Sequence, residues 1–496
     1  MRLAVAAALI WFAGAGLAAA EGTLIDAARA MDGPAAQALL AKGADVKARD
    51  ADGATALLWA AHNDDADLAK RLLAAGADPK AANDYGATPM SEAAALGSAE
   101  MLGLLLNAGA DLESPNAEGQ TALMAVARTG NVDAAKLLIA KGANVNAVEH
   151  WGGQTALMWA AAQSQPAMMA ELIAHGAKVD ARGAIHDWER RVTSEPRPKD
   201  MYRGGFTPLL YAAREGCIDC AKQLVAAHAN LNLPDPDGET PLVTALLSQH
   251  FAFAQYLISA GADLDRWDLY GRSPLYAAID MNVLPEGGRP DLPSDETLTG
   301  LDVAKALLEK GANPNLQLKL RPPYRNVVFD RGGDAVLSTG ATTLLHAAKT
   351  GDVAAIALLL KYKALVDLPT ATGVTPLMAA AFMGQGANPS RGRYKTEAQG
   401  IEAIKLLLAA GANVNAKTPQ GQTAIHVAAQ RGYNALVKVL AENGADLTVK
   451  DADGHSAVDY ATGIPNPRGP APESHKETVA LLGQLMAGAP APAKKR

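Results

Sequence analysis

Cysteine, aromatic residues and long apolar runs are all scarce in this chain of 496 residues. With only 5% aromatic residues, the sequence favours thin, closely stacked helices over a thick globular core. No segment beyond residue 20 is long and apolar enough to cross a membrane, which takes about 20 residues. Acidic residues outnumber basic ones, and the formal net charge of −7 disfavours nonspecific binding to nucleic acid.

The first 20 residues have the pattern of a secretory signal peptide. Arg2 precedes an apolar run over 3–15, and the alanines at 18–20 form a small-residue cleavage site. A membrane anchor is the alternative, but the run is shorter than a spanning helix. We therefore expect removal of residues 1–20 and an exported mature protein. Two cysteines fit a bacterial periplasm better than eukaryotic secretion, where so long a chain usually carries more.

One unit recurs along the rest of the chain at a nearly fixed spacing. It consists of a small-residue turn, a short helix and a second helix that ends at a glycine. The step from the first-turn glycine to the closing glycine is normally 23 residues, and the step to the next unit is 10. Such a period predicts a solenoid with one continuous core. The first-turn glycines are Gly53, Gly86, Gly119, Gly153, Gly205, Gly238, Gly271, Gly340, Gly373, Gly421 and Gly454.

This unit resembles the ankyrin repeat, whose signature is T-P-L-H-x-A. The fuller matches are Thr207-Pro208-Leu209, Thr240-Pro241-Leu242, Thr375-Pro376-Leu377 and His426. The resemblance covers nearly all of residues 22–486, in eleven units and an N-terminal cap. It implies an all-α repeat solenoid of helix-turn-helix units joined by short β-hairpins, in which hairpins and first helices line a concave groove. His346 and His426 are both assigned to the signature histidine, which forms hydrogen bonds across the repeat turn.

Steps that exceed the normal spacing locate four inserts, two in hairpins and two between paired helices. His228 and Lys363 replace closing glycines, which predicts a slightly strained turn at each. The predicted organisation is a capping repeat at 21–50, ankyrin repeats at 51–180, 205–315 and 339–450, hairpin inserts at 181–204 and 316–338, inserts between helices at 282–300 and 385–399, a C-terminal capping repeat at 451–486 and a disordered basic tail at 487–496.

Both hairpin inserts carry a net charge of +2 and hold aromatic residues in a chain that has few. Protein interfaces are enriched in arginine and aromatic side chains. The predicted partner-binding residues are Trp151, Trp188, Arg190, Arg191, Tyr202, Arg203, Tyr270, Arg272, Tyr324 and Arg325.

Cys217 and Cys220 form a Cys-x-x-Cys pair at a predicted helix start. Haem attachment would need a histidine directly afterwards, and Ala221 stands there. A thioredoxin-like site would need a βαβ unit, which an ankyrin array lacks. The spacing allows a disulfide, so we expect either a short-loop disulfide or a buried pair of thiols. A redox role is the lesser alternative.

No catalytic, cofactor-binding or metal-binding residue is predicted. The Asp-x-Asp-Gly runs that begin at Asp50, Asp235 and Asp451 resemble calcium loops but lack the glutamate at position 12. We interpret them as hairpin turns. His186 and Glu189 form a single i,i+3 pair, which is too little for a metal site.

The expected function is an exported, non-enzymatic ankyrin-repeat scaffold for protein–protein interaction, which binds a protein of unknown identity through its concave face and bordering inserts. The alternative is a binder of an anionic ligand or a cell-envelope surface, in which the basic inserts make the contact.

Overall fold

The computed structural model describes residues 22–116, 118–186, 203–282, 297–322, 336–381, 395–464 and 474–488. The predicted signal peptide and most of the four inserts lie outside these ranges, and so does the predicted tail from residue 489 onward. Residues 487 and 488, assigned to the tail from sequence, instead complete the last helix. Among the described residues, no helix combines the length and the apolar character that a membrane span requires.

The described residues form 24 α-helices that fall into two compact units. The first unit, residues 1–151 with 174–176, contains α1 (Leu24–Arg29), α2 (Gly33–Ala41), α3 (Ala56–His62), α4 (Ala66–Ala74), α5 (Pro89–Leu96), α6 (Ala99–Asn107), α7 (Ala122–Thr129) and α8 (Val132–Ala140).

The remaining residues make up the second unit, which holds the other helices. They are α9 (Ala156–Ala162), α10 (Pro166–Ala174), α11 (Pro208–Glu215), α12 (Ile218–Ala226), α13 (Pro241–Leu247), α14 (Phe251–Ser259), α15 (Pro274–Asn282), α16 (Gly300–Glu309), α17 (Thr343–Thr350), α18 (Val353–Lys361), α19 (Pro376–Ala380), α20 (Glu397–Ala409), α21 (Ala424–Gln430), α22 (Asn434–Glu442), α23 (Ala457–Thr462) and α24 (Lys476–Gly488).

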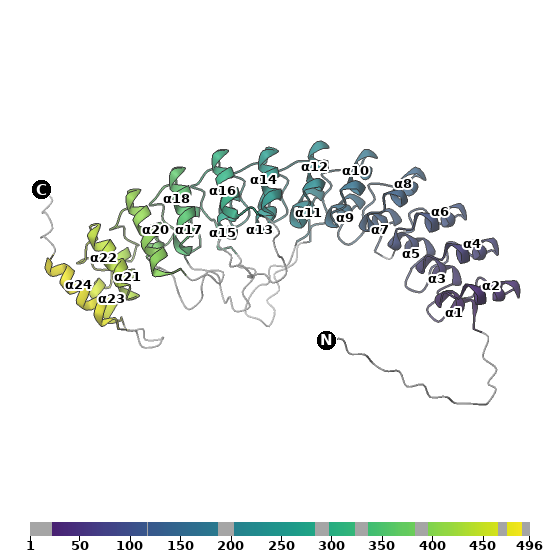
Figure 1. The fold of residues 1–496 in the computed structure, drawn as a ribbon, viewed down its shortest axis with the longest axis horizontal. Helices are drawn as coiled ribbons and strands as arrows, with labels where there is room; N and C mark the ends of the chain where they lie inside the picture. Colours follow the sequence, from purple (N-terminus) through teal and green to yellow (C-terminus); the bar gives the residue numbers. More distant parts are fainter. Residues whose placement is uncertain are drawn as a thin grey trace, which may run out of the picture. The chain divides into compact units, whose positions relative to one another are not determined.

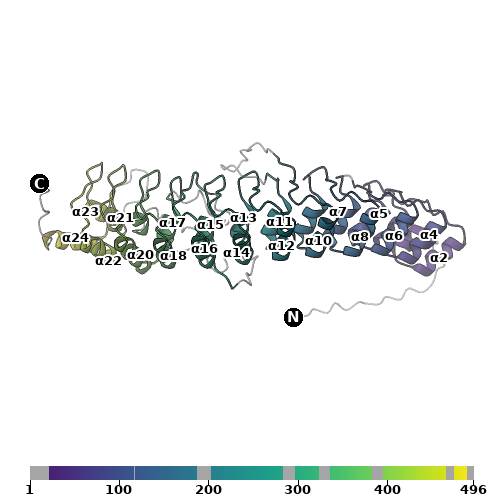
Figure 2. The ribbon, with the colours of Figure 1, turned by 90° about the horizontal axis from the view of Figure 1, so that it is seen from above.

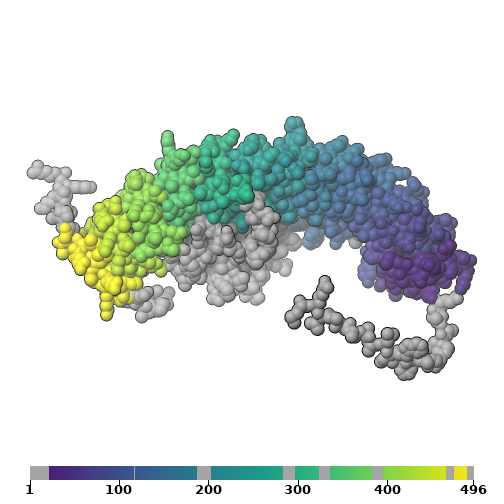
Figure 3. Space-filling model, viewed as in Figure 1, coloured from purple at the N-terminus to yellow at the C-terminus, as the bar shows by residue number. Residues whose placement is uncertain are grey.

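Each unit is built from two layers of helices. In the first unit, α1, α3, α5 and α7 pack in succession, and α2, α4, α6 and α8 form the second layer (Figure 1). In the second unit, the odd-numbered helices from α9 to α23 form one layer and the even-numbered helices from α12 to α24 form the other (Figure 2). Neighbouring repeats within a unit pack in direct contact (Figure 3). This arrangement confirms the predicted helical repeat solenoid.

Threonine and proline begin the first helices, as predicted. The hydroxyl of Thr207 accepts a hydrogen bond from the backbone N–H of Leu210 (3.3 Å), and Pro208 occupies the first turn. The hydroxyl satisfies an N–H group that has no partner within the helix, and proline lacks the N–H that would otherwise need one. The same threonine–proline start occurs in α5, α13 and α19.

Small and branched side chains fill the space between the layers. Ala60 and Ala61 of α3 are fully buried, and so is Leu72 of the paired helix α4. Alanine lets the two helices approach closely, and leucine fills the gap that remains between them. The paired alanines and leucines of the repeat therefore form the core, which explains why the chain needs few aromatic residues.

The closing turns show the strain predicted at His228 and Lys363. Their φ angles are 62° and 64°, in the left-handed region where glycine is usual. Gly261 and Gly411 close other repeats with φ angles of 92° and 89°. The repeat geometry thus requires a left-handed backbone conformation at this turn even where the residue is not glycine.

Helix α20 begins inside the insert predicted at 385–399. The side chains and backbone of Thr396 and Gln399 bond reciprocally: Thr396 Oγ1 accepts from the N–H of Gln399 (3.2 Å), and Gln399 Oε1 accepts from the N–H of Thr396 (3.0 Å). Such a capping box fixes a helix start. The insert therefore ends earlier than the repeat spacing indicates.

Candidate partner-binding surface

The hairpins between repeats are held at their tips by acidic or amide side chains. Oδ1 of Asp235 accepts hydrogen bonds from the backbone N–H groups of Asp237 (2.9 Å) and Glu239 (2.8 Å). These bonds support the interpretation of the Asp-x-Asp-Gly runs as turns. The same pair of bonds forms at Asp50, Asn83, Asn116, Asp268 and Asp451.

Backbone hydrogen bonds join successive hairpins of the second unit into a row. The N–H of Leu269 donates to the carbonyl oxygen of Asp237 (2.7 Å), and the N–H of Lys319 donates to that of Tyr270 (2.8 Å). Gly271 has a φ of 82°, and a Cβ atom there would lie 2.5 Å from the nitrogen of Lys319. Glycine therefore permits this close approach of two hairpins. In Figure 2 the hairpins of the second unit project from one edge.

Exposed apolar side chains lie at the tips of two hairpins in this row. The exposed fractions are 47% for Trp267, 45% for Leu269 and 49% for Leu320. A backbone bond from Leu320 N–H to the carbonyl oxygen of Tyr270 (3.2 Å) holds the two tips together. Clustered apolar exposure marks interaction sites on soluble proteins. We call these three residues, together with the exposed Arg266, Lys319 and Arg321, the hairpin patch.

The hairpin patch is basic as well as apolar. Nζ of Lys319 lies 5.7 Å from the ring centroid of Trp267, within cation–π range. Two acidic residues are nearest in the sequence: Asp268 is buried and bonded to Arg272, and Asp265 is half-buried and accepts the N–H of Asn313 (2.8 Å). The exposed surface therefore combines aliphatic and indole area with positive charge.

Arg272, one of the predicted partner-binding residues, is buried and holds the hairpin row together instead. Its side chain is 3% exposed. Nε donates to Oδ2 of Asp268 (2.6 Å), and Nη2 donates to Oε1 of Glu239 (2.8 Å). Burial disfavours the charged guanidinium, but the two carboxylates outweigh that effect and raise the pKa of Arg272. The assignment of Arg272 to a partner contact is thus corrected to an internal role.

Asp235 lies beside Glu239, one of the two carboxylates that bind Arg272. Burial, followed by the negative charge of Glu239, raises the pKa of Asp235 to about 7. Hydrogen bonds from the N–H groups of Glu239 and Asp237 favour the ionised carboxylate but do not offset the burial. One carboxyl in the hairpin row therefore titrates near neutral pH.

The first helices carry a variable position four residues after the capping threonine. Trp59, Trp159 and Tyr211 occupy it in three repeats, and each is half-buried. Nε1 of Trp59 donates to Oδ2 of Asp50 (3.3 Å), and the guanidinium of Arg29 lies 4.7 Å from its ring centroid. These large rings pack on neighbouring repeats while leaving part of their area accessible to a partner.

His346 occupies this variable position rather than the signature position assigned from sequence. Thr342 caps α17, since its hydroxyl accepts from Leu345 N–H (3.1 Å), so His346 is the fourth residue after the cap. His426 is the third residue after Thr423 and accepts the Thr423 N–H through Nδ1 (3.1 Å). His426 therefore stands at the signature position and bonds to the start of its own helix, whereas the assignment of His346 to the signature position is wrong.

His346 instead belongs to a buried polar cluster with Asp280 of α15, Lys349 of α17 and Lys395. Lys395 directly precedes Thr396, the residue that caps α20. Nε2 of His346 lies 3.0 Å from Oδ1 of Asp280. Burial lowers the pKa of Lys349 to about 7 and lowers that of Lys395 far below its ordinary value. Nζ of Lys395 donates to the carbonyl oxygen of Ala380 (2.7 Å). These four side chains are buried, so the cluster is internal and is not part of the exposed surface.

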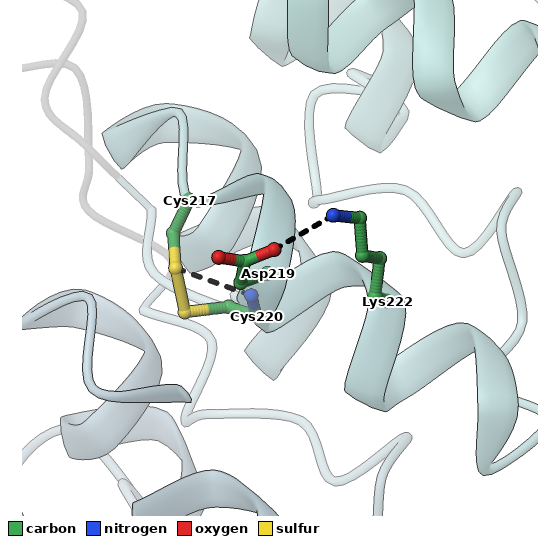
Figure 4. The surroundings of a disulfide bond; sticks show 4 residues. All are labelled: Cys217, Asp219, Cys220 and Lys222. Atoms are coloured by element: carbon green, nitrogen blue, oxygen red, sulfur yellow. Dashed lines mark hydrogen bonds and ion pairs between the residues drawn. A yellow bond between two sulfur atoms is a disulfide. The ribbon is translucent and has the colours of Figure 1, made fainter. Parts of the chain in front are cut away.

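Cys217 and Cys220 are joined by a disulfide at the start of α12, with a Cα–Cα distance of 5.2 Å (Figure 4). Cys217 is half-buried and Cys220 is fully buried. Of the two states expected from the sequence, the structure therefore holds the short-loop disulfide.

The other predicted partner-binding residues occupy different settings. Trp151 is 69% exposed at a hairpin tip of the first unit. Arg203 is partly exposed and forms an ion pair with Asp237 (3.7 Å). Tyr270 is half-buried between the two tips of the hairpin patch, with the guanidinium of Arg272 at 5.2 Å from its ring centroid. Trp188, Arg190, Arg191, Tyr202, Tyr324 and Arg325 lie outside the described residues.

The sequence reasoning missed Trp267, Leu269 and Leu320. A usable signal was present, because the tips at 235–238 and 451–454 read Asp-x-Asp-Gly, whereas the tip at 268–271 reads Asp-Leu-Tyr-Gly after a tryptophan. Apolar residues at a hairpin position that is polar in other repeats indicate an interaction surface.

One group of possible metal ligands occurs in the described part of the chain. Asp451, Asp453 and His455 each place a ligand atom within 4.8 Å of the others. However, Oδ1 of Asp451 accepts two backbone N–H groups, and Oδ2 accepts the hydroxyl of Tyr460 (2.8 Å). The group is thus another instance of the hairpin turn.

Models of the ankyrin repeat match most of the chain. The model for ankyrin repeats in three copies matches residues 24–116, 104–183 and 209–318. The model for many copies matches 407–461, and that for a single ankyrin repeat matches 372–419.

Curated relatives match this chain over part of their length. The E3 ubiquitin-protein ligase KEG of Arabidopsis thaliana is 24% identical over an alignment of 305 residues that covers 52% of this chain and 18% of that protein. The B-cell lymphoma 3 protein homolog of Mus musculus is 34% identical over 113 residues, 23% of this chain and 22% of that protein. The chain therefore spans less than a quarter of the length of either relative.

A solved structure, the human ASB11 ankyrin repeat domain, matches with a TM-score of 0.41 and 23% identity, covering 49% of this chain and 99% of that domain.

Helix pairs, capping threonines and hairpins recur at the spacing of one repeat family. The three-copy model alone matches more than half of the chain. Ankyrin repeats are scaffolds for protein–protein interaction, because stacked repeats present an extended binding surface. This chain belongs to the ankyrin-repeat family.

Proposed function

We propose that this protein is an exported, non-enzymatic scaffold that binds a protein partner through the hairpin patch and the adjoining face of the first helices. The hairpin patch carries the proposal: three apolar side chains are each more than two-fifths exposed beside three exposed basic residues. Tryptophan and arginine contribute the most energy at protein interfaces. The partner's side chains would bury this apolar area and exclude water from it.

The partner segment that fits this surface carries acidic side chains next to apolar ones. The exposed residues Arg266, Lys319 and Arg321 directly flank the apolar residues Trp267 and Leu320 in the sequence, and the carboxylate of Asp268 is bonded to Arg272. Opposite charge on the partner would raise the rate of association and fix the orientation of docking. The affinity would come mainly from burial of Trp267, Leu269 and Leu320.

A photo-reactive amino acid at position 269 tests this function. It should cross-link to a defined protein in cells, and the same substitution at position 305 should not, because Lys305 lies exposed on α16 away from the hairpins. Identical products from the two positions, or none from 269, would refute the proposed surface.

Export is part of the proposal. It is supported by the signal-like pattern of residues 1–20 and by the disulfide, which suits an oxidising compartment. A phosphatase that folds only outside the cytoplasm, fused after residue 30, should become active. Activity should vanish when the apolar run at 3–15 is interrupted by two arginines, and equal activity of both fusions would argue against export.

A second candidate function is binding of an anionic ligand or cell-envelope surface, which the three basic residues of the hairpin patch favour. Such binding would weaken steeply with salt, because exposed charges are screened. Anionic vesicles offered to the wild type and to a Leu269→Ser, Leu320→Ser variant separate the two functions. Equal vesicle binding by both, abolished by salt, would support this candidate, whereas absence of vesicle binding would remove it.

A further inference from the structure

Cys217 of the Cys217–Cys220 disulfide stands where several other repeats place an oxygen that caps the second helix. At the start of the second helices, Oδ1 of Asp65 accepts from Leu68 N–H (2.9 Å), and Oγ of Ser98 accepts from Met101 N–H (3.3 Å). In α12 the acceptor is Sγ of Cys217, 3.2 Å from the nitrogen of Cys220. Sulfur is a weak acceptor compared with a carboxylate or hydroxyl, so helix capping does not account for this residue choice.

Chain entropy does not account for the disulfide either. The two cysteines are three positions apart, and the helix already fixes the backbone between them. A disulfide restricts the unfolded chain more as the loop it closes grows longer. A disulfide that closes so short a loop, and whose sulfur is a weak helix cap, adds little to the stability of the fold. The presence of the two cysteines is therefore better explained by the reactivity of their sulfur atoms.

The two sulfur atoms differ in their access to a reaction partner. Cys217 is half-buried at the helix start, whereas Cys220 is fully buried, so an incoming thiolate reaches the Cys217 sulfur first. After reduction, the first-turn N–H groups and the helix dipole would stabilise a thiolate on Cys217. Asp219 is the acidic residue of this turn, and Nζ of Lys222 lies 2.8 Å from its Oδ1 and offsets its charge (Figure 4).

We infer that this disulfide is a thiol–disulfide exchange site that oxidises a dithiol of another protein or peptide. A substrate thiolate attacks Sγ of Cys217, the disulfide bond breaks, and its electron pair leaves on Cys220, which takes up a proton. The second substrate thiolate then attacks the substrate sulfur of the mixed disulfide and releases the Cys217 thiolate. The substrate loses two electrons to form its own disulfide, and the chain gains them as two thiol groups.

The test uses the full chain and a reduced peptide with two cysteines. Oxidised wild type should convert one peptide per chain to its disulfide, at least tenfold faster than glutathione disulfide does at equal concentration. Alkylation and mass spectrometry would count the two new thiols on the chain. Persistence of the Cys217–Cys220 bond in excess reduced peptide would overturn the inference.

Single variants test which sulfur reacts. Cys220→Ser, treated with glutathione disulfide, should form the mixed disulfide on Cys217 at least tenfold faster than Cys217→Ser forms it on Cys220. Cys217→Ser restores an oxygen at the cap, as at Ser98, so it should fold normally, which a melting curve would verify. Equal rates at both sulfurs in folded variants would contradict the asymmetry. A Cys217 thiol that titrates in the ordinary range in Cys220→Ser would also count against the site.

Discussion

Nε2 of His346 lies 3.0 Å from Oδ1 of Asp280, which joins two neighbouring repeats across 66 residues of sequence. Each side chain is only 2% exposed. A buried polar pair depends on both members, because the loss of one leaves the other without its hydrogen bond and without water. The pair therefore links α15 to α17, which are separated in the sequence by the two inserts predicted at 282–300 and 316–338.

Replacing Asp280 should destabilise this part of the solenoid. We expect Asp280→Ala to lower the free energy of unfolding by about 2–4 kcal/mol. Asp280→Asn keeps an acceptor for Nε2 and should lose less than half of that amount. Urea unfolding, together with hydrogen exchange of the amides of α15 and α17, would measure both effects. Unchanged exchange in these helices after Asp280→Ala would contradict the role of the pair.

Asp235→Asn should stabilise the protein at alkaline pH. Because the folded state raises the pKa of Asp235 from 3.8 to about 7, it holds more protons than the unfolded state between these values. Ionisation of this carboxyl therefore lowers the free energy of unfolding as the pH rises from about 4 to about 7. Above pH 7 the variant should gain up to about 4 kcal/mol, and at pH 3.5 the difference should be small.

The asparagine should preserve the turn, since Asn83 makes the same two backbone hydrogen bonds in another repeat. Urea unfolding of both proteins at pH 3.5 and pH 8 provides the comparison. A stability difference that does not change with pH would show that Asp235 is not protonated in the folded state.

Lys363→Gly should relieve the left-handed strain at a closing turn. A non-glycine residue at a φ of 64° costs roughly 1–2 kcal/mol, and the added freedom of glycine in the unfolded chain cancels part of the gain. We expect a net stabilisation of about 0.5–1 kcal/mol in thermal or urea unfolding.

The matched control is Gly411→Ala in the next repeat, where φ is 89° and a Cβ atom would meet nothing within 4 Å. It should destabilise by about 1 kcal/mol, because the backbone strain outweighs the lower freedom of alanine in the unfolded chain. Destabilisation by Lys363→Gly would mean that the lysine side chain contributes more than the strain costs.

The sequence predicted the helices well because their signals are local. A capping threonine, a first-turn proline and a closing glycine each act within a few residues, as Thr207 and Pro208 do in α11. The period then extends these signals along the chain. His346 was misplaced because Thr342 and Thr343 are adjacent, either could cap the helix, and the choice between them shifts every later position by one.

The surface was harder to predict because exposure depends on contacts between hairpins. Arg272 and Trp267 lie five residues apart, yet Arg272 is buried between Asp268 and Glu239 while Trp267 is open to solvent. Glu239 belongs to the preceding hairpin, 33 residues away. The sequence pattern gives no direct sign of that approach, so it selected an arginine that serves the fold and overlooked the exposed tips.

The dissociation constant of the cross-linked partner tests the central claim most directly. A Trp267→Ala, Leu320→Ser variant should bind it at least about 30-fold more weakly, because interface anchors contribute about 2 kcal/mol or more. Leu365→Ser, at a residue 54% exposed outside the hairpin patch, should bind as the wild type does. A double variant that folds normally and binds within about twofold of wild type would contradict the account.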